Sequence, residues 1–272
     1  MQFRNISIHP LLKGYIEKMW LFESDGRASS DDIKLIVPNG RIKIAVPYRN
    51  GIIADANKSP HITKEHSITL VGIFDKPSTM DIAANESSGT ICAEFSPGGA
   101  YRFFRLPLSD IKNGFFSLTE ILGRMAKQLQ EEMANAETTD KKASLFQQFL
   151  LKQFLQYTDD TIFQYCVEKI TSSKGTITIK ELEKKTGYSS RWLNMKFTER
   201  LGVSPKNLAS IIRFRHYYET LCGNQKLFVR NDFYHYYYDQ SHFIKDFKRF
   251  TGLTPTGLEN KINDFGKVFY NV

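Results

Sequence analysis

Two short stretches of the sequence carry side chains that can read the edges of nucleic-acid bases. These residues are Arg191, Asn194 and Met195 in the first stretch and Gln240, Ser241, Ile244 and Lys245 in the second. Arginine and asparagine make paired hydrogen bonds to guanine and adenine in a major groove. Such contacts require a helix that holds these residues on one open face.

The two stretches repeat one pattern at an offset of fifty residues. The first reads YSSRWLNMKFTERLGVSP (188–205) and the second YYYDQSHFIKDFKRFTGLTP (236–255). The offset pairs Leu193 with Phe243 and Phe197 with Phe247, so each unit has apolar residues four positions apart on one buried helix face. Gly202 and its counterpart predict a left-handed helix end, and the Ser-Pro or Thr-Pro that follows predicts a new helix start.

The residues before the first repeat complete a helix-turn-helix. Ile179 and Leu182 predict a short amphipathic helix, Gly187 permits a tight turn, and Ser189 or Ser190 caps the next helix. Residues 205–221 read as one connecting helix of roughly 26 Å. A rod of that length can hold two recognition helices near the ~34 Å spacing of successive major-groove faces.

The second repeat resembles the signature of the AraC/XylS-type (arabinose-regulator) bacterial transcription factors. The resemblance covers roughly residues 160–262 and implies a seven-helix module with two helix-turn-helix units that read adjacent major grooves. It places the base-reading positions on the seven residues named above. It also implies phosphate contacts at the helix N-termini near Ser189, Ser190 and Thr254. Basic side chains that could add to these contacts are Lys196, Lys206 and Arg249.

Two positions depart from that family's pattern. Glu183 stands where a small residue is expected in the first helix of the first unit. In the second unit Tyr237 lies opposite Gly187 in the repeat, and tyrosine does not readily adopt positive φ. We therefore expect the turn before Asp239 to be built differently. We also expect the recognition helix of the second unit, the second reader of DNA, to bind more weakly or to be reoriented.

The N-terminal part reads differently from the rest. Up to about residue 115 short β-branched runs and Pro-Asn-Gly or Arg-Asn-Gly turns predict strands and hairpins, with Pro97-Gly98-Gly99 interrupting a strand. This region also resembles the sensor-type domains of some of these regulators, which are small cupin-like β-barrels. Two interpretations of a barrel interior remain open: it holds a pocket for a small, largely apolar effector, or it is packed solid. The aromatic candidates for its lining are Trp20, Phe22, Phe74, Phe95 and Tyr101.

The predicted fold class is α+β, with a β-rich cupin-like domain and a C-terminal all-α domain that carries two helix-turn-helix units. Apolar residues at helical spacing predict a helical pair at 118–134 and 143–156, separated by a polar break at 135–142. These helices offer a surface for dimerisation. We place the boundary after residue 157, which gives a sensing or dimerising domain at 1–157 and a DNA-binding domain at 158–272.

Charge and cysteine content agree with this division. The net charge is +8, and residues 159–272 hold 18 Lys and Arg against 12 Asp and Glu, so this part contributes +6. A basic part of a chain favours a polyanionic partner. Three scattered cysteines and an opening without an apolar signal core favour a reducing cytoplasm. No apolar run approaches the ~20 residues of a membrane span.

The sequence thus predicts a sequence-specific DNA-binding transcriptional regulator. Its expected partners are double-stranded DNA, a small-molecule effector, a second copy of the chain and RNA polymerase, with no membrane. Two alternatives remain: a protein-interaction scaffold that does not bind DNA, and a cupin-type metal enzyme. His61, Glu65 and His66 lack a cupin metal-ligand pattern, so we expect no metal, no cofactor and no enzymatic activity.

Overall fold

A computed structural model describes residues 2–25, 35–56, 59–82, 87–223, 237–255 and 257. The N-terminal part contains two antiparallel sheets. The six-stranded sheet has the order β1 (Gln2–Asn5), β2 (Ile16–Ser24), β9 (Ser88–Phe95), β4 (Lys43–Arg49), β7 (Thr69–Val71) and β10 (Phe115–Ser117). The four-stranded sheet has the order β3 (Leu35–Ile36), β8 (Ser78–Ile82), β5 (Ile52–Ala56) and β6 (Ser59–Ile62).

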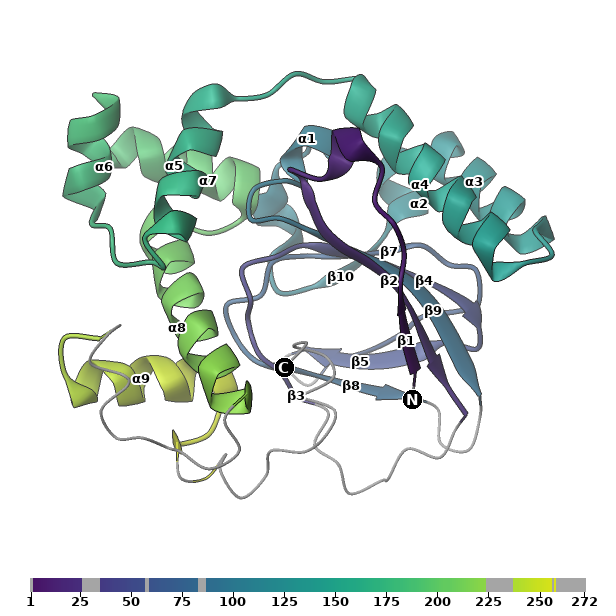
Figure 1. The fold of residues 1–272 in the computed structure, drawn as a ribbon, viewed down its shortest axis with the longest axis horizontal. Helices are drawn as coiled ribbons and strands as arrows, with labels where there is room; N and C mark the ends of the chain where they lie inside the picture. The colour runs from purple at the N-terminus through teal and green to yellow at the C-terminus, as the bar shows by residue number, and fades with distance from the viewer. Residues whose placement is uncertain are drawn as a thin grey trace.

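Alternation along the central strands of the larger sheet creates two different faces. On β9, Ile91 and Phe95 are fully buried in the main core, and Cys92 points to the opposite face because successive side chains alternate. In Figure 1 the helices α1 to α4 cover one side of this sheet, and β3, β5 and β8 lie on the other. The predicted β-rich domain is therefore confirmed as a pair of antiparallel sheets.

The helices of the N-terminal part differ in detail from the prediction. After Gly98 and Gly99 the chain forms the short helix α1 (Tyr101–Phe104), where a continued strand was expected. The expected helix 118–134 is split into α2 (Leu118–Leu122) and α3 (Arg124–Asn135) because Gly123 adopts a φ of 56°. The next helix, α4 (Thr139–Leu155), starts four residues earlier than expected, since Thr138 caps it.

The C-terminal part is helical where it is described. It comprises α5 (Thr161–Ser172), α6 (Ile179–Thr186), α7 (Ser190–Leu201), α8 (Pro205–Gly223) and α9 (Gln240–Thr251). The expected start after residues 158–160 is confirmed, because the Asp160 side chain accepts a hydrogen bond from the Phe163 amide at 3.0 Å. Residues 224–236 lie outside the described residues, and with them most of the helix expected before α9.

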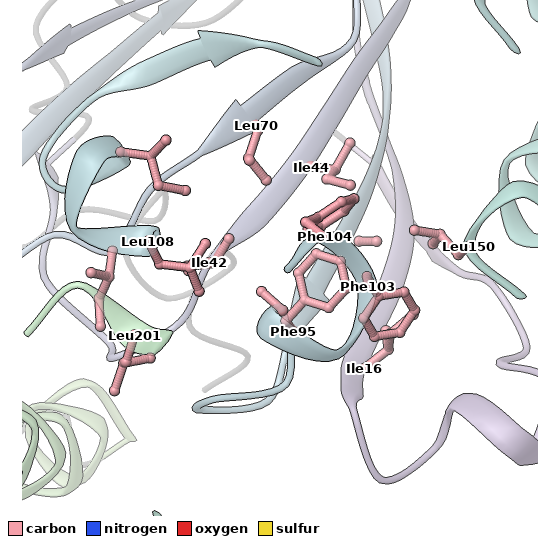
Figure 2. Close-up of a cluster of buried hydrophobic side chains, with 14 of the residues drawn as sticks. Ile16, Ile42, Ile44, Leu70, Phe95, Phe103, Phe104, Leu108, Leu150 and Leu201 are labelled. Carbon is pink, nitrogen blue, oxygen red and sulfur yellow. The ribbon is translucent and has the colours of Figure 1, made fainter. Parts of the chain in front are cut away.

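One hydrophobic core runs from the larger sheet into the C-terminal helices. It includes Phe95 and Leu108 of the N-terminal part as well as Leu193 and Leu201 of α7, all with at most 1% exposure. Figure 2 shows Leu201 beside Leu108, which lies in the turn η2 (Leu108–Ile111), with Leu150 of α4 at the other end of the cluster. The two parts of the chain therefore share buried apolar surface.

Candidate functional site

The helices α6 and α7 form a helix-turn-helix corner. Thr178 and Glu181 close a capping box at the start of α6, with the Thr178 amide donating to Glu181 Oε2 at 2.7 Å. Gly187 ends α6 at a φ of 74°, a conformation that favours glycine. Ser189 then caps α7 by accepting a hydrogen bond from the Trp192 amide at 3.4 Å. The corner has the elements that the sequence predicted.

The helix α7 separates a buried face from an open one. Leu193 and Phe197 are fully buried, whereas Met195 is 55% exposed. Arg191, Asn194 and Thr198 are also exposed. We call Arg191, Asn194, Met195 and Thr198 the open face of α7. The structure brings together on this face all three residues of the first predicted base-reading set.

The helix α9 repeats this arrangement. Phe243 and Phe247 are buried, and the four residues of the second predicted set, Gln240, Ser241, Ile244 and Lys245, are all exposed. Asp239 caps the helix by accepting a hydrogen bond from the His242 amide at 2.7 Å.

Tyr237, which stands opposite Gly187 in the repeat, is 3% exposed and packs against Phe243 with ring centroids 5.3 Å apart. Its side chain therefore belongs to the buried apolar cluster that also contains Phe214 of α8 and Phe247 of α9.

Three backbone amides at or just before the start of α7 have partners within the protein. The Ser190 amide donates to Oε1 of Glu183, and the Tyr188 amide donates to Oγ1 of Thr186 at 3.3 Å. The hydroxyl of Ser189 accepts a hydrogen bond from the Trp192 amide, as described above. Thr254 similarly accepts a hydrogen bond from the Gly257 amide at 3.2 Å.

The helix α8 connects the two recognition-type helices. It begins at Pro205, directly after Ser204, whose hydroxyl accepts a hydrogen bond from the Asn207 amide at 3.1 Å. Its 19 residues span about 28 Å at 1.5 Å per residue. Figure 1 shows α8 running from the α5–α7 group to α9, as the predicted connecting rod should.

A polar cluster around Asp75 ties the N-terminal part to α8 and α9. Oδ2 of Asp75 lies 2.7 Å from Nζ of Lys112 and accepts a hydrogen bond from Nδ2 of Asn207 at 2.9 Å. Arg249 donates to Oδ1 of Asn207 at 2.8 Å and lies 3.3 Å from the same Asp75 oxygen. Burial alone would raise the pKa of Asp75. Hydrogen bonds from Lys112, Asn113 and Asn207 instead lower this pKa to about 2. Arg249, a candidate for phosphate contact, is thus held by the N-terminal part.

A cavity of about 100 Å³ lies between the two sheets. Trp20 and Phe74, two of the five candidate residues, line it together with residues of both sheets such as Ala45, Ala54 and Cys92. Burial raises the pKa of the Cys92 thiol to about 12, which keeps it neutral. Most of the lining is apolar, and Asn39, Arg41, Lys43 and Ser78 are its polar members.

Three of the predicted pocket residues do not line this cavity. Phe95 points to the opposite face of its sheet and packs on Phe103, with ring centroids 4.9 Å apart. Phe22 packs on Phe3 at 5.0 Å. Tyr101 lies on α1, where the guanidinium carbon of Arg200 sits 5.2 Å from its ring centroid. The period of two along a strand explains the Phe95 result, since only every second side chain faces the cavity.

The sequence reasoning missed a buried ion cluster at one wall of this cavity. Glu94 is 4% exposed and pairs with Arg41 Nη1 at 2.5 Å and with Lys43 Nζ at 3.2 Å. Burial would raise the pKa of Glu94, but Lys43 and Arg41 lower it to about 2. The signal available in the sequence was the spacing of Arg41 and Lys43, two residues apart, with Lys43 on β4 opposite Glu94 on β9.

Within the described ranges, no three His, Cys, Asp or Glu side chains are grouped so that they could hold a metal ion. Among the same residues no helix has the length and apolar character needed to cross a membrane.

Residues 5–117 match a family model described as a domain of unknown function (DUF6597). A comparison with curated protein sequences found no match. Similar solved structures include an apo variant of ToxT from Vibrio cholerae, with 13% identity and a TM-score of 0.48 over 90% of this chain and 98% of that one. ToxT bound to an unsaturated fatty acid gives 13% identity and a TM-score of 0.47 over 97% and 98%.

A third solved structure is described as the AraC-like transcriptional activator CuxR. It gives 15% identity and a TM-score of 0.27 over 75% of this chain and 74% of that one. The fold of the present chain is α+β, with a β-rich N-terminal part and a helical C-terminal part.

Proposed function

We propose that this protein is a sequence-specific DNA-binding transcriptional regulator. Residues 158–272 are the DNA-binding domain, in which α7 and α9 read adjacent major grooves. Residues 1–157 are the sensing or dimerising domain. Phosphate contacts make binding sensitive to salt, and base contacts from Arg191 and Asn194 supply much of the specificity.

The observation that carries this proposal is the shared design of α7 and α9. Each helix buries residues four apart, Leu193 and Phe197 or Phe243 and Phe247, and opens a polar face to solvent. Each is capped by a short side chain and ends at a left-handed glycine. The side chains on both open faces are of types that contact base edges.

We also propose that the cavity between the sheets binds a small, largely apolar effector. Its cations are already paired, Arg41 with Glu17 and Glu94 and Lys43 with Glu94. These cations therefore do not require an anionic ligand, and a neutral ligand can occupy the cavity. Phe74 and Ser78, which line the cavity, flank the turn that carries Asp75. Effector binding can in this way change the contacts between Asp75 and α8 or α9.

Selection of bound sequences from random duplex DNA, repeated at two salt concentrations, tests the proposal. The full chain should enrich a defined site, and its affinity should fall as salt rises. Failure to enrich any sequence, together with salt-independent binding, would refute the DNA-binding role. Sedimentation of the same sample tests whether the helical pair supports a dimer.

A further inference from the structure

We infer that Glu183 takes the place of a DNA phosphate at the N-terminus of α7 and thereby weakens nonspecific DNA binding by that helix. The inference rests on the proposed function. It concerns the position at which the family pattern expects a small residue and this chain has a carboxylate.

The geometry places the carboxylate where a bound anion would sit. Oε1 of Glu183 accepts the hydrogen bond of the Ser190 amide, the first residue of α7. Two residues further, the Trp192 amide donates to Ser189 Oγ. The free amides at a helix N-terminus are the donors that bind phosphate groups. In this chain two of those donors are taken by the protein itself.

The electrostatic effect acts in the same direction. The positive end of the helix dipole stabilises one nearby negative group, and Glu183 already supplies it. A phosphate brought to the same place would meet the Glu183 carboxylate, and like charges at contact distances repel each other. The exposed neighbours Lys184, Lys185 and Arg191 are basic, so Glu183 is a negative group within a positive surface.

The consequence is a shift in how α7 gains affinity. Phosphate contacts hold any sequence equally, whereas base contacts depend on the sequence. Weakening the phosphate contact at α7 lowers the affinity for all duplexes and leaves the contacts of Arg191 and Asn194 as the main attraction. Glu183 therefore lowers the sequence-independent part of the affinity without touching a base.

The test compares Glu183→Gln with the matched control Glu181→Gln. Both substitutions remove one negative charge from α6 and keep an oxygen acceptor. Glu181, however, belongs to the capping box at the start of α6 and does not contact α7 through a hydrogen bond that the structure shows. Fluorescence anisotropy of the full chain gives Kd for a selected duplex and for a scrambled duplex of equal length. We expect Glu183→Gln to bind the scrambled duplex about two- to fivefold more tightly than the control does. The Kd for the selected duplex should fall by a similar factor, because a phosphate contact does not depend on the sequence.

A second variant tests the same inference by removing the side-chain oxygen that accepts the hydrogen bond of the Ser190 amide. Glu183→Ala places a small residue at this position and frees the Ser190 amide, so it should bind scrambled DNA at least as tightly as Glu183→Gln. Equal Kd values for Glu183→Gln and Glu181→Gln, or weaker binding by both Glu183 variants, would overturn the inference while leaving the proposed function standing. Absence of DNA binding by the unsubstituted chain would overturn both.

Discussion

Asp75 Oδ2 lies 3.3 Å from Nη2 of Arg249, a contact that joins the turn before β8 to the second recognition-type helix. Residues on either side of Asp75, Phe74 and Ser78, line the cavity between the sheets. Arg249 follows Lys245 by four residues, so the two lie on neighbouring positions of one helix face. The contact therefore links the proposed effector cavity with the proposed DNA surface.

Asp75→Asn should lower the free energy of unfolding at pH 7 by about 1 kcal/mol, after allowance for solvent screening. The pKa of Asp75 is lowered to about 2, so its contribution is present above the unfolded-state pKa and is lost as pH falls toward 2. Urea unfolding at pH 7 and pH 3 measures this. The difference between variant and unsubstituted chain should shrink at pH 3. Asp110→Asn, an exposed control in η2, should change neither value.

Leu193→Ala should destabilise the chain by about 2–5 kcal/mol, because it removes a fully buried side chain and leaves a cavity. Met195→Ala, two residues away and 55% exposed, is the matched control and should cost little. Thermal or urea unfolding distinguishes the two. Equal losses would mean that α7 is turned the other way on the core.

The second reader should contribute less than the first. The sequence has Tyr237 where the first unit has the left-handed Gly187, and tyrosine does not readily adopt positive φ. Alanine substitution of Gln240 and Lys245 together should therefore weaken binding of the selected duplex less than Arg191→Ala does. Anisotropy titrations of both variants measure the difference. A loss from the double variant as large as that from Arg191→Ala would show that α9 is a full reader.

The cavity should prefer a small neutral apolar ligand over a charged one of similar size. Indole should bind in preference to benzoate, because Arg41 and Lys43 are already neutralised by Glu17 and Glu94. Ligand-observed NMR with both probes measures this. Ala45→Phe fills the cavity wall and should abolish indole binding, whereas Ala134→Phe on the exposed side of α3 should not. Preferential binding of benzoate would contradict the prediction.

The helix-turn-helix could be predicted from the sequence because its determinants are local. Gly187, Ser189 and the four-residue spacing of Leu193 and Phe197 fix a turn, a cap and a buried face without reference to distant residues. The connecting helix α8 followed from Ser204-Pro205 in the same way. The register of α9 followed from the fifty-residue repeat.

Contacts between distant segments could not be predicted. The cluster around Asp75 joins residues that are 132 and 174 positions apart in the chain, and nothing local marks them as partners. Three of the five candidate pocket residues do not line the cavity, for a related reason. Phe95 was chosen for its type, but the face that a strand residue occupies depends on register. The sequence analysis did not predict the helix break at Gly123, which depends on a positive φ, or the start of α4 at Thr139, which depends on the Thr138 cap.

The most direct test of the central claim is the effect of Arg191→Ala on binding of the selected duplex. The account predicts a loss of about tenfold or more in affinity for that duplex and a much smaller loss for a scrambled duplex. Arg49→Ala, which removes an exposed arginine paired with Glu23 on the larger sheet, is the control and should leave both affinities unchanged. Equal affinities for Arg191→Ala and Arg49→Ala on the selected duplex would contradict the assignment of α7 as a reader of DNA.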